Sequence, residues 1–373
     1  MDRPFLSILI PTKNRSHYLS YAIQSALALP SNDLEIIVSE NFGSDDGLAV
    51  ARSFTDPRLK VIQPPRPMAM HDHWEFLLSN SSGEWITIIG DDDAILPNAL
   101  DNVRTIFANY PFVEAIYSAR SYFFWPLELG LSGRVQFSVS KELKIDDSKD
   151  CLNKLLKGQL LYCYAPQIYS GGFLRRTLIR RVINSRGRFF YSTIPDATSA
   201  LNALLFTTSF VRTGIPLTIV GTSPSKAQST NTRLAKDRDA DFFGSLGESG
   251  VDLHPAVDGF RNHTFSMCFL DTYLTASPLI NLRDVDREFI TPLIYRSIID
   301  YQKAGRIDLA ALLAASSGVA FPDNLALDNY QRLFPEEVPD PISGSTVYSS
   351  KPDGMIETIS QAVALISSVI SSA

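Results

Sequence analysis

The chain has 373 residues, of which 45% are hydrophobic and 20% charged, and its mean hydropathy is +0.01. These values are typical of a folded globular protein and exclude the disordered and fibrous classes. A net charge of −6 gives no broad basic surface, so we expect no nucleic-acid partner. Three cysteines, Cys151, Cys163 and Cys268, are widely spaced without a CxxC pair, which predicts reduced thiols rather than disulfides or a zinc site.

The chain starts with Met1-Asp2-Arg3-Pro4 and a short apolar segment, which lacks the long apolar region of a signal peptide. No apolar run is long enough to span a bilayer. We therefore expect a cytoplasmic protein without a transmembrane segment, and leave a peripheral position at the membrane open. Residues 356–370 carry apolar side chains at helical spacing but almost no Lys or Arg, so this helix is expected to pack on its own protein rather than on a membrane surface.

Strand and helix patterns alternate through the first third of the chain. Strands are predicted at 5–10, 34–39, 59–63, 85–89 and 113–118, and helices at 17–29 (after a Ser16 cap), 45–54, 73–79 and 98–109. This alternation predicts an α/β fold, a Rossmann-like, mostly parallel sheet with helices on both faces.

The pattern is weaker after residue 118. Residues 122–139 are expected to be irregular or a hairpin, 197–207 a helix and 211–220 a strand, and the Ser-, Thr- and Lys-rich stretch 221–241 a mobile loop. From residue 260 the patterns are helical. We therefore divide the chain into residues 1–220, a linker at 221–259 and a helical C-terminal region at 260–373, whose apolar faces leave homodimerisation open.

Three consecutive acids, Asp91, Asp92 and Asp93, follow the apolar run Trp85–Ile89 and precede Pro97. Adjacent carboxylates repel one another, so a divalent cation or a metal-bound diphosphate would stabilise them. An acidic turn with one helix-capping Asp explains the triplet equally well when it is taken alone. Polar segments also follow the other strands, at 11–15, 40–41 and 67–73, and ligands of parallel sheets bind at such strand ends.

These motifs, in this order, resemble the family 2 glycosyltransferases, which have the GT-A fold. The matching elements, which cover residues 4–220, are Ser7–Arg15, Glu35–Asn41, Ser44–Gly47, Gly83–Asp93, Pro97–Leu100 and, more faintly, Pro195-Asp196. The resemblance implies an inverting, metal-dependent glycosyltransferase of polysaccharide or cell-surface glycan synthesis. Such an enzyme moves a sugar from a nucleotide-sugar donor, with UDP-sugar as our first choice, to a hydroxyl of a glycan or lipid-linked acceptor.

The resemblance also implies roles for individual residues. The expected donor-binding residues are Pro11, Thr12, Asn14, Arg15, Glu40, Asn41, His73, Asp91, Asp93 and Lys226. Within this set, Thr12, Asn14 and Arg15 would surround the base and Glu40 would accept a hydrogen bond from it, while Lys226 would close over the diphosphate. Helix capping by Thr12 or Asn14, a solvated Arg15 or Lys226 and a helix-starting role for His73 are the structural alternatives.

The family's Asp-x-Asp metal motif is altered here, because Gly90 takes the place of its first acid. The resemblance then implies Asp92 as the ligand of Mn²⁺ or Mg²⁺, with Asp91 at the ribose or sugar and Asp93 supporting the site or acting as a further ligand. Asp196 matches the position of the catalytic base, although on sequence alone it would be read as a helix cap after Pro195.

Two other functions remain open. The lost first Asp would suit a catalytically silent GT-A module that binds glycan or a partner protein. A sugar nucleotidylyltransferase is less favoured, because Pro11–Arg15 contains no glycine for a phosphate-binding loop.

Overall fold

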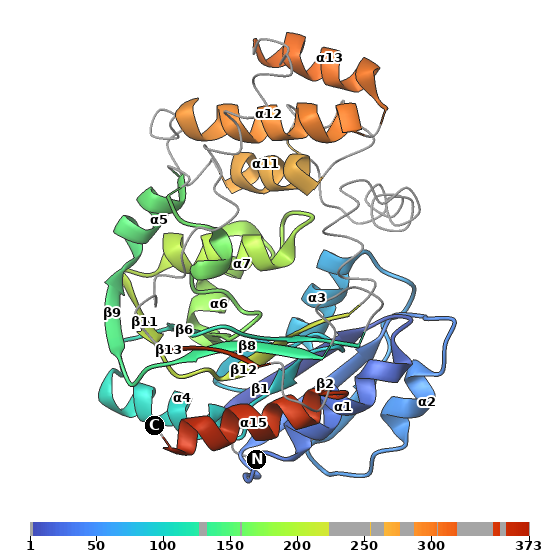
Figure 1. Cartoon of the computed structure of the whole chain (residues 1–373), viewed down its shortest axis with the longest axis vertical. Coiled ribbons are helices and arrows are strands. Elements are labelled where there is room, and N and C mark those ends of the chain that lie inside the picture. The colour runs from blue at the N-terminus through green and yellow to red at the C-terminus, as the bar shows by residue number, and fades with distance from the viewer. Residues whose placement is uncertain are drawn as a thin grey trace.

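The computed structural model describes residues 3–126, 133–156, 159–223, 254, 265–276, 287–303, 305–318, 346–350 and 356–372 (Figure 1). The helices are α1 Ser16–Leu27, α2 Gly47–Arg52, α3 Met70–Ser79, α4 Ala99–Asn109, α5 Ser148–Leu156, η1 (a 3₁₀ helix) Tyr162–Tyr164, α6 Arg176–Arg186, α7 Pro195–Phe206, α11 Phe265–Ala276, α12 Arg287–Lys303, α13 Ile307–Ser317 and α15 Ile359–Ser372. The strands are β1 Leu6–Thr12, β2 Leu34–Glu40, β3 Leu59–Ile62, β4 Trp85–Ile88, β5 Ala94–Ile95, β6 Ala115–Ser118, β7 Ser121–Phe124, β8 Arg134–Val139, β9 Leu143–Asp147, β10 Gly172–Arg175, β11 Ser209–Thr213, β12 Thr218–Thr222 and β13 Thr346–Ser350.

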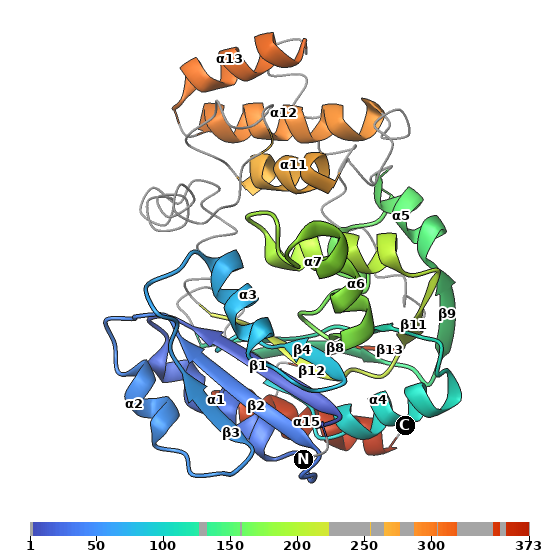
Figure 2. The same ribbon diagram turned by 180° about the vertical axis from the view of Figure 1, so that it is seen from behind.

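The central sheet has eight strands in the order β3-β2-β1-β4-β10-β6-β11-β9. Neighbouring strands β3, β2, β1 and β4 are parallel, as are β6 and β11, while β10 and β9 run antiparallel to their neighbours. The parallel half is seen well from behind (Figure 2). Since β10 is antiparallel to both β4 and β6, these two strands run in the same direction. The carboxyl ends of β1, β2, β3, β4, β6 and β11 therefore lie at one edge of the sheet. We call this edge the carboxyl rim.

Helices cover both faces of this sheet. The apolar side chains of β1 alternate, so that Ile8 and Ile10 pack with α1, α2 and α4, whereas Leu9 packs with α3, α6 and α7. These strand side chains are fully buried. Such near-continuous apolar runs are what a parallel sheet covered on both faces requires. The predicted α/β architecture is confirmed.

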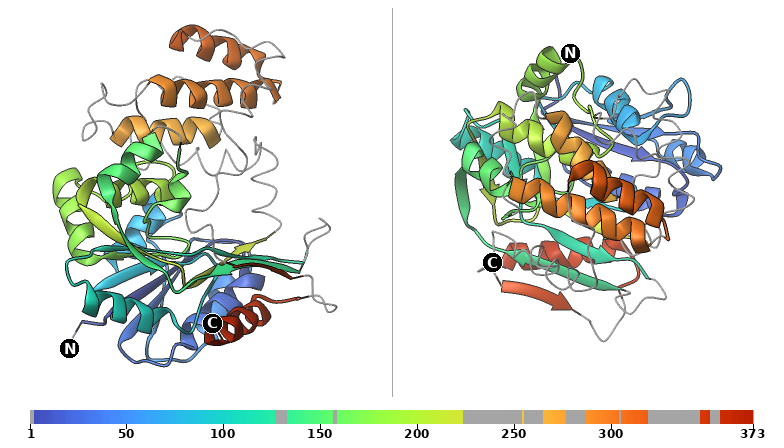
Figure 3. Two further views of the ribbon diagram at one scale, coloured as in Figure 1. Left: turned by 60° about the vertical axis from the view of Figure 1, so that its left-hand side comes forward. Right: turned by 90° about the horizontal axis from the view of Figure 1, so that it is seen from above.

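A second sheet of five strands, β13-β8-β7-β12-β5, extends the carboxyl rim. Helix α15 packs beneath it and beside α1, with Ile359 and Ile366 fully buried against Trp125 and Phe137 (Figure 3). The prediction that residues 356–370 form a helix packed on its own protein is confirmed. In space this helix lies with the first part of the chain, although the sequence analysis grouped it with the C-terminal region.

The other C-terminal helices form a stack, α11 on α7, then α12 and α13 (Figure 1). Phe269 and Tyr273 of α11 join the core that lies over α7, while Tyr301 and Leu313 make a separate small core between α12 and α13. The expected helical region is therefore present. Among the described helices, none combines the length and apolar content needed to cross a membrane.

Two local predictions are wrong. The stretch 211–220 forms two strands, β11 and β12, because Gly214 and Pro216 break it and send the second half into the other sheet. Ser16 does not cap α1, since no side-chain bond caps this helix. The carboxylate of Asp45 instead accepts the Ser16 N–H at 2.6 Å. Of the two alternatives for residues 122–139, irregular structure or a hairpin, the antiparallel pair β7 and β8 supports the hairpin.

Candidate active site

Side chains from the ends of β1 and β4 meet at the carboxyl rim. Thr12 Oγ1 donates to Asp91 Oδ2 at 2.8 Å, and Arg15 Nη1 donates to Asp92 Oδ2 at 2.9 Å. The same guanidinium nitrogen lies 3.5 Å from Asp91 Oδ1. Residues separated by more than 70 positions in the chain are thus in direct contact, which confirms that the segment 11–15 and the acids 91–93 converge. The structure places Arg15 against the carboxylates rather than in solvent.

Asp92 is buried and has several hydrogen-bond partners besides Arg15. Its Oδ2 also accepts a hydrogen bond from Ser223 Oγ at 2.6 Å, and its backbone carbonyl accepts one from Trp125 Nε1 at 3.0 Å. The residue is 2% exposed. A buried carboxylate is costly to desolvate unless it has charge and hydrogen-bond partners, and here Arg15 and Ser223 supply them.

Asp93 points to the opposite side of the turn. Its Oδ2 accepts the Gly90 N–H at 2.7 Å and its Oδ1 accepts the Gly221 N–H at 2.8 Å, so it ties β12 to the acidic turn. Close approach to the backbone requires a glycine at 221, whereas at Gly90 the nearby atoms are ends of side chains. A Cβ at Gly221 would lie 1.7 Å from the Asp92 carbonyl oxygen, and one at Gly90 would lie 2.9 Å from Asp93 Oδ2 and 3.1 Å from Tyr169 Oη. These contacts give Asp93 a structural role, and its predicted role at the metal or donor stays a prediction.

The chemistry of Asp91 and Asp92 fits a divalent cation. Both carboxylates already approach one positive group, the Arg15 guanidinium, so their oxygens converge on a position that favours positive charge. Within the described residues no group of three His, Cys, Asp or Glu side chains forms a complete metal cage. Mg²⁺ is usually held in this incomplete way, by one or two carboxylates together with substrate phosphates and water. Arg15 would have to move or share Asp92 with the ion.

The end of β2 is organised by Glu40 and Asn41. Glu40 accepts hydrogen bonds from the Gly43 N–H and, at 2.9 Å, from Gln63 Nε2. Asn41 makes two hydrogen bonds with the Met68 backbone, at 2.8 and 2.9 Å, which fix the loop that leads into α3. Pro11 and Thr12 lie opposite Ser39 and Glu40 in the β1–β2 register. These residues border the same rim, and their predicted contacts with a nucleoside stay predictions.

Asn14 shapes the loop between β1 and α1. It adopts φ 58°, in the left-handed region that Asn tolerates better than most residues. Its Oδ1 accepts the Ser44 N–H at 2.5 Å, so it also links the loops after β1 and β2. Helix capping, the alternative stated for Asn14 above, is not observed, because neither α1 nor α2 has a side-chain cap.

His73 is buried in the first turn of α3, where its Nε2 lies 2.8 Å from Ser39 Oγ. Burial lowers its pKa to about 4, and the nearby Lys13 charge acts in the same direction. The imidazole is therefore neutral at pH 7 and bridges α3 to β2. Burial likewise lowers the pKa of His71 to about 4. Neither histidine is available as a positively charged partner for a diphosphate.

Asp196 lies in the first turn of α7, just after Pro195. Because α7 leads into β11, which is parallel to β6, this first turn faces the carboxyl rim. Asp196 Oδ2 accepts a hydrogen bond from Tyr162 Oη at 3.0 Å. Burial raises the pKa of this carboxyl, although the Tyr162 hydrogen bond and the Arg120 charge oppose the rise. A carboxylate with a raised pKa at the rim is suited to accept a proton.

Residue Ile168 connects the acidic turn with α7. Its carbonyl accepts the Ile88 N–H at 2.7 Å and its N–H donates to Ser199 Oγ at 3.1 Å, one turn after Asp196. The next residue, Tyr169, is the one whose hydroxyl approaches Gly90. This short segment therefore connects the strand that precedes the acidic turn with the helix that carries Asp196.

Several residues at this rim were missed by sequence reasoning: Arg120, Trp125, Tyr162, Tyr169 and Ser223. Arg120 lies two residues after the end of β6, and the rule that polar residues at strand ends gather at one rim would have found it. The others follow no motif, because they come from loops whose position depends on the packing of both sheets. Lys226 lies outside the described residues.

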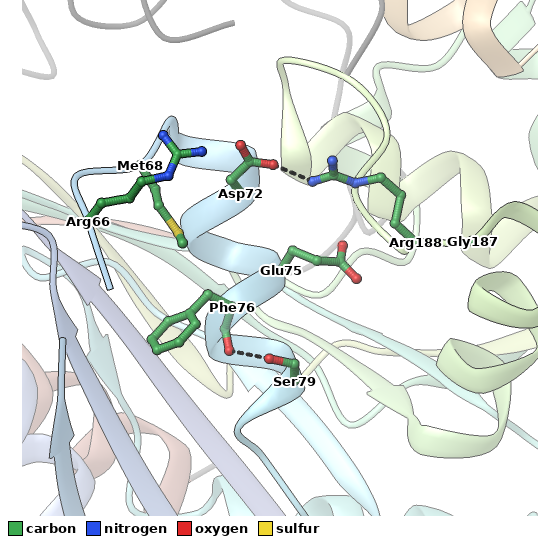
Figure 4. Close-up of a pocket in the computed structure, with 8 residues that line it drawn as sticks. All are labelled: Arg66, Met68, Asp72, Glu75, Phe76, Ser79, Gly187 and Arg188. Carbon is green, nitrogen blue, oxygen red and sulfur yellow. Dashed lines mark hydrogen bonds and ion pairs between the residues drawn. The ribbon is translucent and has the colours of Figure 1, made fainter. Parts of the chain in front are cut away.

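A pocket of about 510 Å³ lies between α3 and the loop after α6 (Figure 4). Its lining residues are Arg66, Met68, Asp72, Glu75, Phe76, Ser79, Gly187 and Arg188. Arg188 donates to Asp72 at 2.6 Å, and Glu75 accepts the N–H groups of Phe189 and Phe190. Burial raises the pKa of Glu75. These contacts attach α3 to the segment that leads into α7.

Residues 7–146 match the sequence model described as Glycosyl transferase family 2. A GalNAc(5)-diNAcBac-PP-undecaprenol beta-1,3-glucosyltransferase of Campylobacter jejuni is 35% identical over 103 residues, which are 27% of this chain and 33% of that protein. An Escherichia coli UDP-Glc:alpha-D-GlcNAc-diphosphoundecaprenol beta-1,3-glucosyltransferase is 25% identical over 31% of this chain and 49% of its own length. The match thus spans between a third and half of these curated relatives.

Among solved structures, Staphylococcus aureus TarS 1-349 in complex with UDP-GlcNAc aligns with 88% of this chain and 90% of its own, at 14% identity and a TM-score of 0.48. The Pyrobaculum calidifontis mannosyltransferase PcManGT, in complex with GDP-Man and Mn²⁺, aligns with 90% of this chain and 84% of its own, at 16% identity and a TM-score of 0.44. The sequence match covers β1 through β9, including the acidic turn and its Thr12 and Arg15 partners. The part of this chain that is similar to glycosyl transferase family 2 is therefore residues 7–146.

Proposed function

We propose that the chain is an inverting glycosyltransferase that moves a sugar from a nucleotide-sugar donor to a hydroxyl of a lipid-linked or glycan acceptor. The observation that carries this proposal is the cluster of Thr12, Arg15, Asp91 and Asp92 at the carboxyl rim of a family 2 domain. Its two acids share one cation, and a base candidate with a raised pKa lies on the adjacent helix.

The reaction requires one bond to form and one to break at the anomeric carbon. The acceptor oxygen attacks the anomeric carbon while the bond between this carbon and the diphosphate oxygen breaks. The electron pair of the broken bond leaves with the nucleoside diphosphate. Asp196 takes the proton of the attacking hydroxyl. A single displacement of this kind inverts the anomeric configuration.

Asp92, together with Asp91, would hold Mn²⁺ or Mg²⁺, which when bound stabilises the negative charge of the departing diphosphate. Thr12 fixes the Asp91 carboxylate through its hydroxyl. Arg15 supplies a second positive group at the same place, because its guanidinium already lies between the two acids. A guanidinium is well suited to bind phosphate oxygens once it leaves a carboxylate.

We further propose UDP-sugar as the donor and a polyprenyl-diphosphate-linked glycan as the acceptor class. The support is that both curated relatives named above are glucosyltransferases of diphosphoundecaprenol-linked sugars, and one of them uses UDP-Glc. A lipid-linked acceptor would bring the enzyme to the membrane surface, so a peripheral location is part of this proposal.

A donor panel tests the activity. The purified full chain is incubated with UDP-, GDP- and dTDP-sugars in Mn²⁺ or Mg²⁺, with and without a synthetic polyprenyl-diphosphate sugar, and release of the nucleoside diphosphate is measured. We expect release from a UDP-sugar that increases when the acceptor is present. Donor binding without any release would favour the silent binding module, and neither binding nor release would reject the enzyme proposal.

A further inference from the structure

Asp196 contacts a cluster of residues that none of the sequence motifs includes. Tyr162 donates its hydroxyl hydrogen bond to Asp196 Oδ2 at 3.0 Å, while the Ala197 N–H donates to Oδ1 at 3.0 Å. Both carboxylate oxygens are therefore held, and the side chain has a defined orientation at the start of α7.

Arg120 supplies positive charge to the same cluster. It follows β6 at the carboxyl rim, and its charge acts on both Tyr162 and Asp196. Burial lowers the pKa of Arg120, but the surrounding phenols and the Cys163 thiol outweigh this and raise it, so the guanidinium stays charged. Its Nε is buried without a hydrogen-bond partner among the described residues. Arg120 as a whole is half-buried, and its guanidinium carbon lies 5.6 Å from the centre of the Tyr122 ring, which holds the charge near the rim.

Helix α11 contacts both Tyr162 and the segment that precedes Asp196. The ring of Phe269 lies 4.7 Å from the ring of Tyr162. Asp271 and Thr272 each lie 2.8 Å from the hydroxyl of Ser192, four residues before Asp196. One helix from the far end of the chain therefore buttresses both Tyr162 and the segment that leads into α7.

We propose that Tyr162 and Arg120 are positioning residues that keep Asp196 ionised and oriented as the proton acceptor of the transfer reaction, and that α11 holds Tyr162 in place. This inference rests on the proposed function. The physical reason is that burial alone favours the protonated acid, which cannot accept the acceptor hydroxyl's proton. A hydrogen bond to the carboxylate and a nearby cation both favour the charged form.

The titratable groups around Asp196 come from several elements. The groups that interact with Tyr162, with Arg120 or with each other are Cys163 of η1, Tyr117 of β6, Tyr122 of β7 and Tyr273 of α11. The other helices that pack against α7 carry Glu75 (α3), Cys151 (α5) and Arg186 (α6). Removal of the Tyr162 hydroxyl leaves the side chains of all these groups in place and leaves Arg120 charged. The variant Tyr162→Phe therefore isolates the hydrogen bond to Asp196.

The test is the pH dependence of kcat/KM for transfer by the full chain. Activity falls at low pH as Asp196 becomes protonated, so loss of a bond to the carboxylate moves this acid limb to higher pH. For Tyr162→Phe we expect a shift of about one pH unit, hence about tenfold less activity below the limb, with donor affinity unchanged. Tyr164→Phe, in the same 3₁₀ helix, is the matched control and should keep the wild-type limb.

Arg120 gives an independent test. Arg120→Gln should move the limb in the same direction, whereas Arg120→Lys, which keeps the charge, should restore most of it. A Tyr162→Phe protein with the wild-type limb and wild-type kcat would overturn the inference while leaving the proposed function intact. A wild-type chain without transfer on any donor would instead reject the proposed function itself.

Discussion

The acid pair Asp91 and Asp92 and the single acid Asp196 lie at the same carboxyl rim and differ in how far their partners offset burial. Asp91 and Asp92 share the Arg15 guanidinium and accept hydroxyl hydrogen bonds from Thr12 and Ser223, which favours their charged forms. Asp196 has a raised pKa because burial outweighs one phenol hydrogen bond and a distant cation. The first arrangement suits the binding of a cation and the second suits the acceptance of a proton. Enclosure alone therefore does not define the role of an acid here; its partners do.

The largest effect is expected at Asp196. The variant Asp196→Asn keeps the size of the side chain but cannot accept the proton, so transfer should fall by roughly 10²–10⁴-fold. Donor binding, measured by calorimetry in Mn²⁺, should stay within about twofold, because this side chain lies on the acceptor side in the proposal. Transfer at the wild-type rate would show that another group is the base, and the contrast between the two acid groups would then be lost.

The metal side is tested by Asp92→Asn. Metal-dependent donor binding should weaken by about 100-fold or more. Even the loss of a residue that only supports a metal ligand lowers metal affinity by about 10- to 100-fold. Asp93→Asn is the matched control, since its carboxylate binds two backbone N–H groups. It should lower thermal stability and leave the metal requirement unchanged. Equal loss of donor binding in both variants would mean that Asp93 also acts at the ion.

The buried histidines predict a loss of stability in acid. The pKa of His73 is depressed to about 4 by burial, so the folded state resists protonation. The stability that this group contributes is fully present above its unfolded pKa of about 6.5 and is lost as the pH falls towards 4. The loss should approach about 3 kcal/mol, and urea unfolding of His73→Gln should show a flatter acid dependence. His17→Gln, at an exposed site, is the control and should follow the wild type.

The smallest effect is expected at Gly90, which replaces the first acid of the family motif. Gly90→Ala places a Cβ 2.9 Å from Asp93 Oδ2, so the Asp93 carboxylate must shift, at a cost of about 1 kcal/mol. Thermal unfolding measures this cost. Unchanged stability would show that the turn adapts freely, and that the absence of the first acid has no steric reason.

The residues that we propose bind the donor were predictable, because they stand at or just after the ends of strands. Thr12 ends β1, Arg15 lies three residues after it, and Asp91 and Asp92 lie three and four residues after β4. Strand order in a parallel sheet brings such positions together. Their contacts, however, were not predictable. Arg15 was assigned to the base of the donor, whereas it lies against Asp91 and Asp92.

The acceptor side was not predictable beyond Asp196. Tyr162, Arg120 and Phe269 come from parts of the chain without a motif, and they meet because α7 packs against both η1 and α11. Contacts of this kind depend on side-chain fit over long sequence separations, which local periodicity does not encode.

The sequence by itself determined the alternating strands and helices, the polar strand ends and the acidic turn, because each depends on short-range periodicity and on local chain geometry. The tertiary structure alone decided that Asp93 ties β12 to this turn, that Arg15 lies between Asp91 and Asp92, and that α15 returns to pack beside α1. It also decided the partners of Asp196. The physical reason is that the burial and charge of a carboxylate are set by the neighbours that fold around it.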